Sequence, residues 1–131
     1  MHLVVPLERR HDWPAVKKFA AAVAGHLARV VPERFTASAA KSRRGGRIYV
    51  DYLRNDPGAT AVAADSCRAP PGAPVSTPLA WEELTPALRA IDFNLNSIPQ
   101  RLAALRDDPW RDYDAQRRAL TRRMWARLDA A

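Results

Sequence analysis

An aspartate, Asp51, lies inside the apolar stretch GRIYVDYLRND, residues 46–56, and Arg54 follows three residues later. Mg²⁺ and Mn²⁺ prefer oxygen ligands and commonly bind one or two carboxylates together with substrate phosphates. The planar guanidinium of arginine matches the geometry of phosphate oxygens. The spacing alone favours a strand-end ion pair between Asp51 and Arg47 or Arg54, without a catalytic role. The functional alternative is metal-dependent phosphate chemistry.

A basic turn, KSRRGGR, precedes this stretch and carries Lys41, Arg43, Arg44 and Arg47. The whole chain of 131 residues has a net charge of +7, from 21 basic and 14 acidic side chains. The charge is +6 over residues 1–56, −2 over residues 57–100 and +3 over residues 101–131. This distribution favours a polyanionic partner such as nucleic acid, and the alternative is a solvated arginine-rich surface.

The other reactive side chains form no familiar motif. His2, His11 and His26 lack partners at metal-binding spacing, and Cys67 is the one cysteine, so neither a zinc site nor an internal disulfide is expected. No apolar run approaches the roughly 20 residues of a membrane span. We therefore expect a cytoplasmic protein with no membrane partner.

The elements that must position these residues alternate between strand and helix. Residues 2–7 are β-branched and apolar and predict a short strand. Residues 12–31 predict a long helix, because Asp12 can cap it, Pro14 suits its first turn and the apolar residues recur at helical spacing. Residues 47–53 and 59–64, separated by the turn RNDPG, predict a hairpin. In this strand Tyr49 and Asp51 share one face.

The second half of the chain predicts short helices. A proline-rich connection over residues 68–78 leads to helix starts at Thr77 and Thr85, each next to a proline, and at Ser97, near Pro99. The last segment, residues 111–131, combines an apolar stripe with the five arginines between Arg117 and Arg127, and predicts a basic amphipathic helix.

Three strings resemble the C-terminal half of the polymerase domain of bacterial DNA ligase D, a member of the archaeo-eukaryotic primase superfamily. They are HLVVPLERRHDWPAVKKFAAAVAGHLA, PERFTASAAKSRRGGRIYVDYLRNDPGATAVA and GAPVSTPLAWEEL. The resemblance divides the chain into residues 1–110, part of that domain, and residues 111–131, a helical tail. It implies a partial primase-like α/β (α+β) fold with a mixed sheet, one long packed helix and short C-terminal helices.

The resemblance also implies roles for individual residues. Asp51 matches the last metal-binding aspartate of the family's catalytic centre, with Mg²⁺ or Mn²⁺ as cofactor, and His2 and Arg54 match contacts to the nucleoside triphosphate. The implied reaction is template-directed nucleotidyl transfer to DNA during non-homologous end joining, with RNA left open as a template or primer. The implied contacts to the nucleic-acid backbone come from the basic turn, namely Lys41, Arg43, Arg44 and Arg47.

The chain departs from the family pattern at its start. The first metal-binding motif, two aspartates separated by one residue, is absent, and neither Asp56 nor Asp65 is well placed to replace it. One carboxylate cannot hold two metal ions, so we expect a truncated domain with little or no polymerase activity. The alternative is a noncatalytic nucleic-acid-binding or assembly module that complements a separately encoded N-terminal half or joins the end-joining ligase. A decayed gene product is a third reading.

Overall fold

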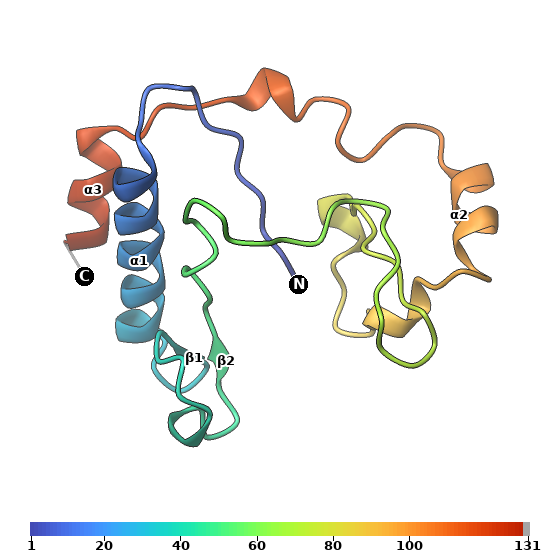
Figure 1. The fold of residues 1–131 in the computed structure, drawn as a ribbon, viewed down its shortest axis with the longest axis horizontal. Coiled ribbons are helices and arrows are strands. Elements are labelled where there is room, and N and C mark those ends of the chain that lie inside the picture. Colours follow the sequence, from blue (N-terminus) through green and yellow to red (C-terminus); the bar gives the residue numbers. More distant parts are fainter. Residues whose placement is uncertain (130–131) are drawn as a thin grey trace. The chain divides into compact units, whose positions relative to one another are not determined.

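In the computed structural model, which describes residues 1–129, the longest element is helix α1, Trp13–Val30 (Figure 1). Asp12 caps it as predicted, because its Oδ1 accepts a hydrogen bond of 2.9 Å from the backbone N–H of Ala15. Pro14 occupies the first turn, and the Val31 N–H donates back to the Leu27 carbonyl at the end of the helix. The predicted long helix is therefore confirmed.

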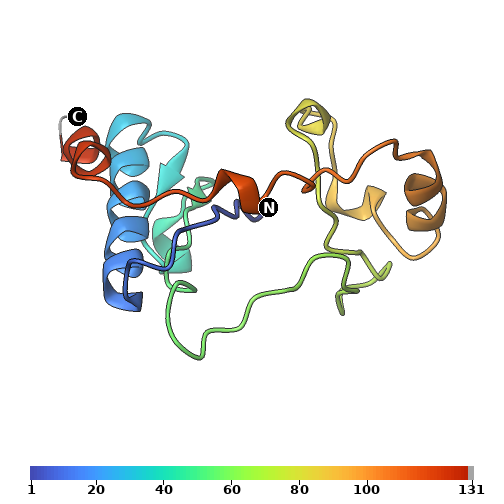
Figure 2. The ribbon, with the colours of Figure 1, turned by 90° about the horizontal axis from the view of Figure 1, so that it is seen from above.

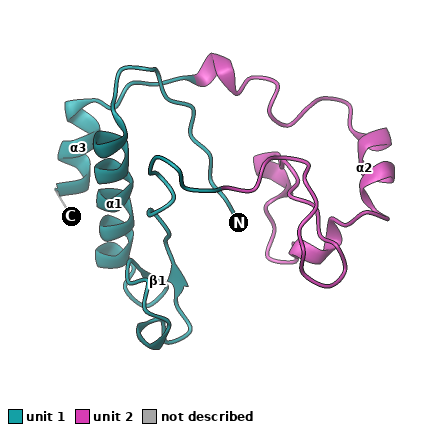
Figure 3. Cartoon of the chain, viewed as in Figure 1, with its two compact units in different colours: residues 1–60, 117–131 teal, residues 61–116 magenta. Residues whose placement is uncertain are grey.

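The chain divides into two compact units (Figure 3). Unit 1 comprises residues 1–60 and 117–131, and unit 2 comprises residues 61–116. Unit 1 contains α1, the sheet and helix α3, Arg122–Asp129. Unit 2 contains helix α2, Ile98–Ala104, and short 3-10 turns. The α/β class predicted from the sequence is confirmed.

The sheet of unit 1 contains two short strands in the described residues. Strand β1, Phe35–Thr36, pairs in parallel with β2, Ile48–Tyr49, so Phe35 lies opposite Ile48. A 3-10 turn, Lys41–Arg43, lies in the connection. The predicted hairpin is wrong, because β2 pairs with β1 and residues 59–64 form no strand. The predicted strand also ends early, since the Asp51 side chain accepts the backbone N–H of Leu53 and turns the chain.

The strand predicted over residues 2–7 is also wrong. Leu3, Val4 and Val5 are exposed, and only Leu7 forms a β-bridge, with Arg118. The Glu8 N–H donates to the Arg118 carbonyl at 3.0 Å. A strand is stable only beside a paired neighbour, and within the described residues this segment has that single bridge.

Helix α3 is shorter than the helical tail predicted over residues 111–131. It begins after Thr121, whose hydroxyl accepts the Met124 N–H at 3.2 Å, and a 3-10 turn, Asp114–Gln116, precedes it. Residues 130–131 of the predicted tail lie outside the described residues. Helix α3 lies beside α1 in both views of the ribbon (Figures 1 and 2).

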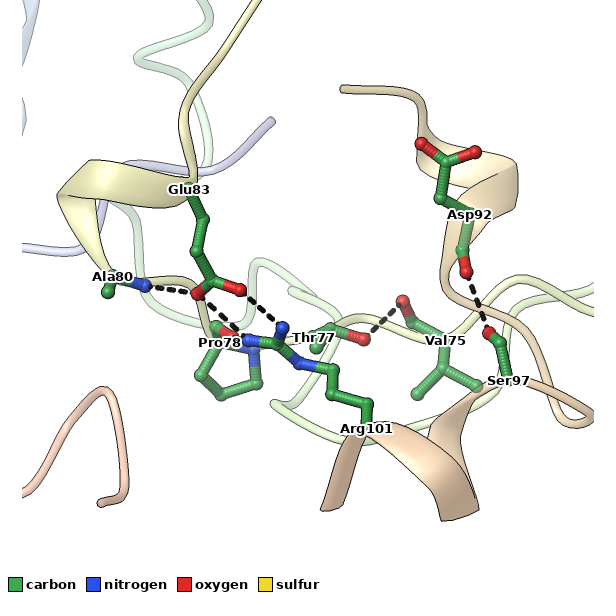
Figure 4. A network of polar contacts seen from close by, with 8 residues as sticks. All are labelled: Val75, Thr77, Pro78, Ala80, Glu83, Asp92, Ser97 and Arg101. Atoms are coloured by element: carbon green, nitrogen blue, oxygen red, sulfur yellow. Dashed lines mark hydrogen bonds and ion pairs between the residues drawn. The ribbon is translucent and has the colours of Figure 1, made fainter. Parts of the chain in front are cut away.

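Unit 2 is held by a polar network centred on Arg101 of α2 (Figure 4). The guanidinium forms a two-pronged ion pair with Glu83, and its Nη2 also donates to the Pro78 carbonyl at 3.0 Å. The second oxygen of Glu83 accepts the Ala80 N–H at 2.8 Å. The helix predicted to start near Ser97 is therefore present as α2. Those predicted at Thr77 and Thr85 are replaced by the 3-10 turns Trp81–Glu83 and Ala90–Asp92.

Candidate functional site

Asp51 lies two residues beyond the end of β2, and its side chain is accessible, with 39% of its surface exposed. Its Oδ1 accepts the Leu53 N–H at 3.0 Å and lies 3.4 Å from the Tyr49 hydroxyl. Its Oδ2 lies 3.6 Å from Nε of Arg54. The ion-pair alternative is therefore present, with Arg54 as the partner. Such an exposed pair stabilises a fold by only about 0–1 kcal/mol, so it does not lock the carboxylate.

Tyr49 links this carboxylate to the basic turn. The guanidinium of Arg44 lies over its ring, 4.8 Å from the centroid. The pKa of the Tyr49 hydroxyl is raised, first by partial burial and then by the negative charge of Asp51, while Arg44 acts in the opposite direction. Tyr49 therefore remains a protonated donor to Asp51 at neutral pH. Its role was missed from the sequence, although the two-residue strand period had placed both side chains on one face.

Arg54 makes a second contact that orients it. Its Nη1 donates to the Thr60 carbonyl at 2.5 Å, while its Nε faces Asp51. The side chain is 58% exposed. Since a guanidinium has five N–H donors, two engaged nitrogens leave further donors available for an anion.

His2 is not joined to this group. The residue is exposed and, in the described residues, makes no hydrogen bond or ion pair with Asp51 or Arg54. The structure thus brings together two of the three residues that the family resemblance assigns to the nucleotide, and leaves the third in the exposed N-terminal segment.

The cations of the basic turn fall into two groups, those bonded within the turn and those exposed to solvent. Arg44 donates to the Ala39 carbonyl at 3.0 Å, and Arg47 donates to the carbonyls of Arg44 and Arg43 at 3.0 and 2.5 Å. These bonds fold the turn on itself. Lys41 and Arg43 are exposed, and their side chains make no hydrogen bond or ion pair in the described residues. These two cations are the ones presented to a ligand.

Among the described residues of unit 1, Asp51 is not part of a cluster of metal-binding side chains. Asp56 forms an ion pair with Lys17 of α1, and Asp65 lies in unit 2 with a left-handed φ of 58°. In the part of the chain that the structure describes, no group of three or more histidine, cysteine or acidic residues could hold a metal ion. Asp51 fits the role of one carboxylate ligand, and the described residues do not fit a complete two-metal site.

The chain that carries this accessible aspartate and the basic turn matches a known class of domain. Residues 1–110 match the family model described as LigD, primase-polymerase domain. The match covers most of the chain, and the chain belongs to this family, whose members function in non-homologous end-joining DNA repair. The resemblance seen in the sequence is therefore confirmed.

Comparison with individual relatives supports the assignment to this family. The chain is 53% identical over 129 residues to the multifunctional non-homologous end joining protein LigD of Pseudomonas aeruginosa, an alignment that covers 98% of the chain and 15% of that protein. It is 32% identical over 95 residues to the protein of the same name from Mycolicibacterium smegmatis, covering 72% of the chain and 12% of that protein. The bifunctional LigD of Bacillus subtilis is 29% identical over 106 residues, 77% of the chain and 17% of that protein.

The chain thus spans less than a fifth of the length of these relatives. The alignment with the Pseudomonas protein extends beyond residue 110 and includes nearly all of the tail segment. No helix among the described residues combines the length and apolar character needed to cross a bilayer. The division of the chain at residue 110 and the roles of the individual site residues stay predictions.

Proposed function

We propose that this chain supplies one metal-binding carboxylate and several phosphate-binding cations to a centre for template-directed nucleotidyl transfer in cytoplasmic DNA end joining. The observation that carries the proposal is the accessible Asp51 carboxylate beside Arg54 at the end of β2. Asp51 would contact Mg²⁺ or Mn²⁺, which supplies charge stabilisation at the transferred phosphate when bound. Arg54 and His2 would contact the nucleoside triphosphate.

The basic turn would hold the nucleic-acid backbone without reading its sequence. Lys41 and Arg43 are the exposed cations of the turn, while Arg44 and Arg47 shape it through bonds to its own carbonyls. Contacts of this type release counterions and are weakened steeply by salt. DNA is the expected nucleic acid, and RNA remains an alternative substrate for the same contacts.

In this proposal the isolated chain has little or no polymerase activity. The test is nucleotide addition to a labelled primer–template with Mn²⁺, for the unaltered chain and the Asp51→Ala variant. We expect no extension by either protein. Robust extension by the unaltered chain that Asp51→Ala abolishes would contradict the predicted inactivity.

Ligand binding tests the site independently of turnover. Titration of the chain with a Mn²⁺–nucleoside triphosphate should show weak binding that Arg54→Ala decreases. Arg10→Ala is the matched control, because Arg10 is also an exposed arginine that pairs with a carboxylate, in this case Glu8. Equal binding by all three proteins would remove Arg54 from the proposed site.

A second candidate function is a noncatalytic module that complements a separate N-terminal half of the domain or the end-joining ligase. Ala24 and Val75 are the buried hydrophobic residues among those described, whereas Leu3, Val5 and Ile48 are more than half exposed. The accessible surface is 10166 Å². Two separate compact bodies of the sizes of units 1 and 2 expose about 8,300 Å² in total.

The exposed apolar side chains, together with the excess of total accessible surface, favour burial against a partner chain. The N-terminal portion of a LigD primase-polymerase domain is the partner to test, by co-expression and size-exclusion chromatography. A stable 1:1 complex, together with DNA binding that persists in EDTA and survives Asp51→Ala, would support the module. Separate elution of the two chains would contradict it.

A further inference from the structure

Helix α3 carries three exposed arginines, Arg122, Arg123 and Arg127. In the described residues their side chains make no hydrogen bond or ion pair. Arg123 and Arg127 are four residues apart and so lie on the same face of the helix. Arginines elsewhere in the chain are commonly paired, as Arg10 is with Glu8 and Arg111 with Asp107.

The positions of these arginines are unfavourable for the helix itself. Arg122 and Arg123 occupy the first turn, where the helix dipole is positive, and this turn contains no acidic residue. Arg123 and Arg127 place like charges at the spacing that brings side chains together. An anion bound along this face would relieve both repulsions.

The opposite face of α3 is occupied by α1. The rings of Trp125 and Phe19 meet edge to face, with centroids 5.0 Å apart and planes at 81°. Three residues later the Leu128 carbonyl lies 3.3 Å from Nδ1 of His26 and accepts a bond of 2.6 Å from Nη2 of Arg29. These contacts advance in the same direction along both helices, so α3 runs parallel to α1 (Figure 1). The three arginines are exposed and lie on the face of α3 that points away from these contacts.

We propose that Arg122, Arg123 and Arg127 form a second surface for the phosphate backbone of nucleic acid, in addition to the basic turn at residues 41–47. The inference rests on the proposed binding of DNA and adds a named surface to it. A basic amphipathic helix also suits an anionic membrane, but such helices bind by burying their apolar face in lipid. In α3 the apolar face is packed on α1, so only the outer, charged face of the helix can bind a ligand. A polyanion with regularly spaced charges, such as nucleic acid, suits this face best.

The test is the salt dependence of binding to a fluorescent 20-base-pair DNA duplex, measured by anisotropy between 50 and 200 mM salt. The α3 variant is Arg122→Gln, Arg123→Gln, Arg127→Gln. The control is Arg9→Gln, Arg89→Gln, Arg106→Gln, which removes the same charge from three exposed arginines that are scattered along the chain. Each lost phosphate contact lowers the slope of log K against log salt by about 0.9. We expect the α3 variant to lose about 2–3 in slope, and the control to lose less than half of that.

Each possible result supports or contradicts the proposed role of the α3 arginines. An α3 variant with three lysines should retain most of the slope, because the contacts depend on charge. Equal losses in the glutamine variant and its control, or an unchanged slope in the α3 variant, would overturn this inference and leave the proposed function standing. Binding to phosphatidylserine vesicles that depends on the α3 arginines, with DNA binding unaffected, would also overturn it. An unaltered chain that does not bind DNA would overturn both proposals.

Discussion

Replacing Arg101 by methionine should destabilise unit 2. The change keeps much of the apolar stem and removes both prongs of the ion pair with Glu83 and the bond to the Pro78 carbonyl. The two side chains are 15% and 30% exposed, so the pair lies between the surface and buried regimes. Surface pairs contribute about 0.2–1 kcal/mol, and breaking a buried pair costs about 3–5 kcal/mol. We expect a loss of about 2 kcal/mol for Arg101→Met.

Native-state hydrogen exchange measures this loss within unit 2. A decrease of about 2 kcal/mol in local stability accelerates exchange by about 30-fold. The amides to follow are those of α2 and of Val75, the buried valine whose N–H donates to the Phe93 carbonyl. The matched control is Arg111→Met, because Arg111 pairs with Asp107 at 2.6 Å on the surface. It should leave exchange unchanged. Equal effects of the two substitutions would refute the assignment of stability to the Glu83–Arg101 network.

The same ion pair has a defined pH dependence. The hydrogen bond from Arg101 is the main cause that lowers the pKa of Glu83 below its ordinary value. A carboxyl whose pKa is lower in the folded state stabilises the fold above its unfolded pKa, and this contribution is lost as the pH falls toward the folded pKa. The difference in exchange between the unaltered chain and Arg101→Met should therefore shrink in acid. A difference that is constant from pH 7 down to pH 3 would contradict this reasoning.

Three further predictions concern unit 1. Titration of tyrosine absorbance should place the pKa of Tyr49 above the ordinary tyrosine value, and Asp51→Asn should lower it only part of the way, because the effect of burial remains. Because the folded pKa of Tyr49 is raised, the contribution of this group to the stability of the fold is present below its unfolded pKa and is lost as the pH rises through its folded pKa. Trp125→Ala should remove exchange protection from α3 and leave that of α1 intact, since an eight-residue helix is marginal without packing. Gly46→Ala should destabilise the chain by about 1 kcal/mol, because Gly46 has a left-handed φ of 78°. Gly25→Ala should stabilise it by about 0.5–1 kcal/mol, because alanine has the higher helix propensity within α1. Urea unfolding measures both changes.

The helices were predictable from sequence where their determinants are local. The aspartate cap, the first-turn proline and the apolar spacing all lie within α1, so its range could be inferred without knowledge of the rest of the fold. The same holds for α2, which begins after Ser97 with Pro99 in its first turn. The C-terminal tail had the correct composition for a helix, but residues 111–121 give their hydrogen bonds to turns and bridges.

A strand was predicted where β2 lies, but the pairing of the strands was not predictable, because a strand depends on its neighbour. Residues 2–7 have β-branched composition, yet they lack a paired strand in the described part of the chain. Ile48 was expected to pair across a hairpin and instead pairs with Phe35, which is 13 residues earlier. The turn at Asp51 exists because a side chain competes with the backbone for the Leu53 N–H, and strand propensity does not measure that competition.

The candidate site shows why a modest ion pair suits the proposed chemistry. Sequence spacing had joined Asp51 to Arg54, and the structure adds that both groups are exposed and that Nε and Oδ2 are 3.6 Å apart. A short, buried pair would resist separation, whereas this one contributes about 0–1 kcal/mol. In the proposed function a cation would take the carboxylate and a phosphate would take the guanidinium, so one weak pair would be exchanged for two stronger ones. Asp51 stays anchored during this exchange by the Leu53 N–H, and Arg54 by the Thr60 carbonyl, so neither side chain must be repositioned from solvent.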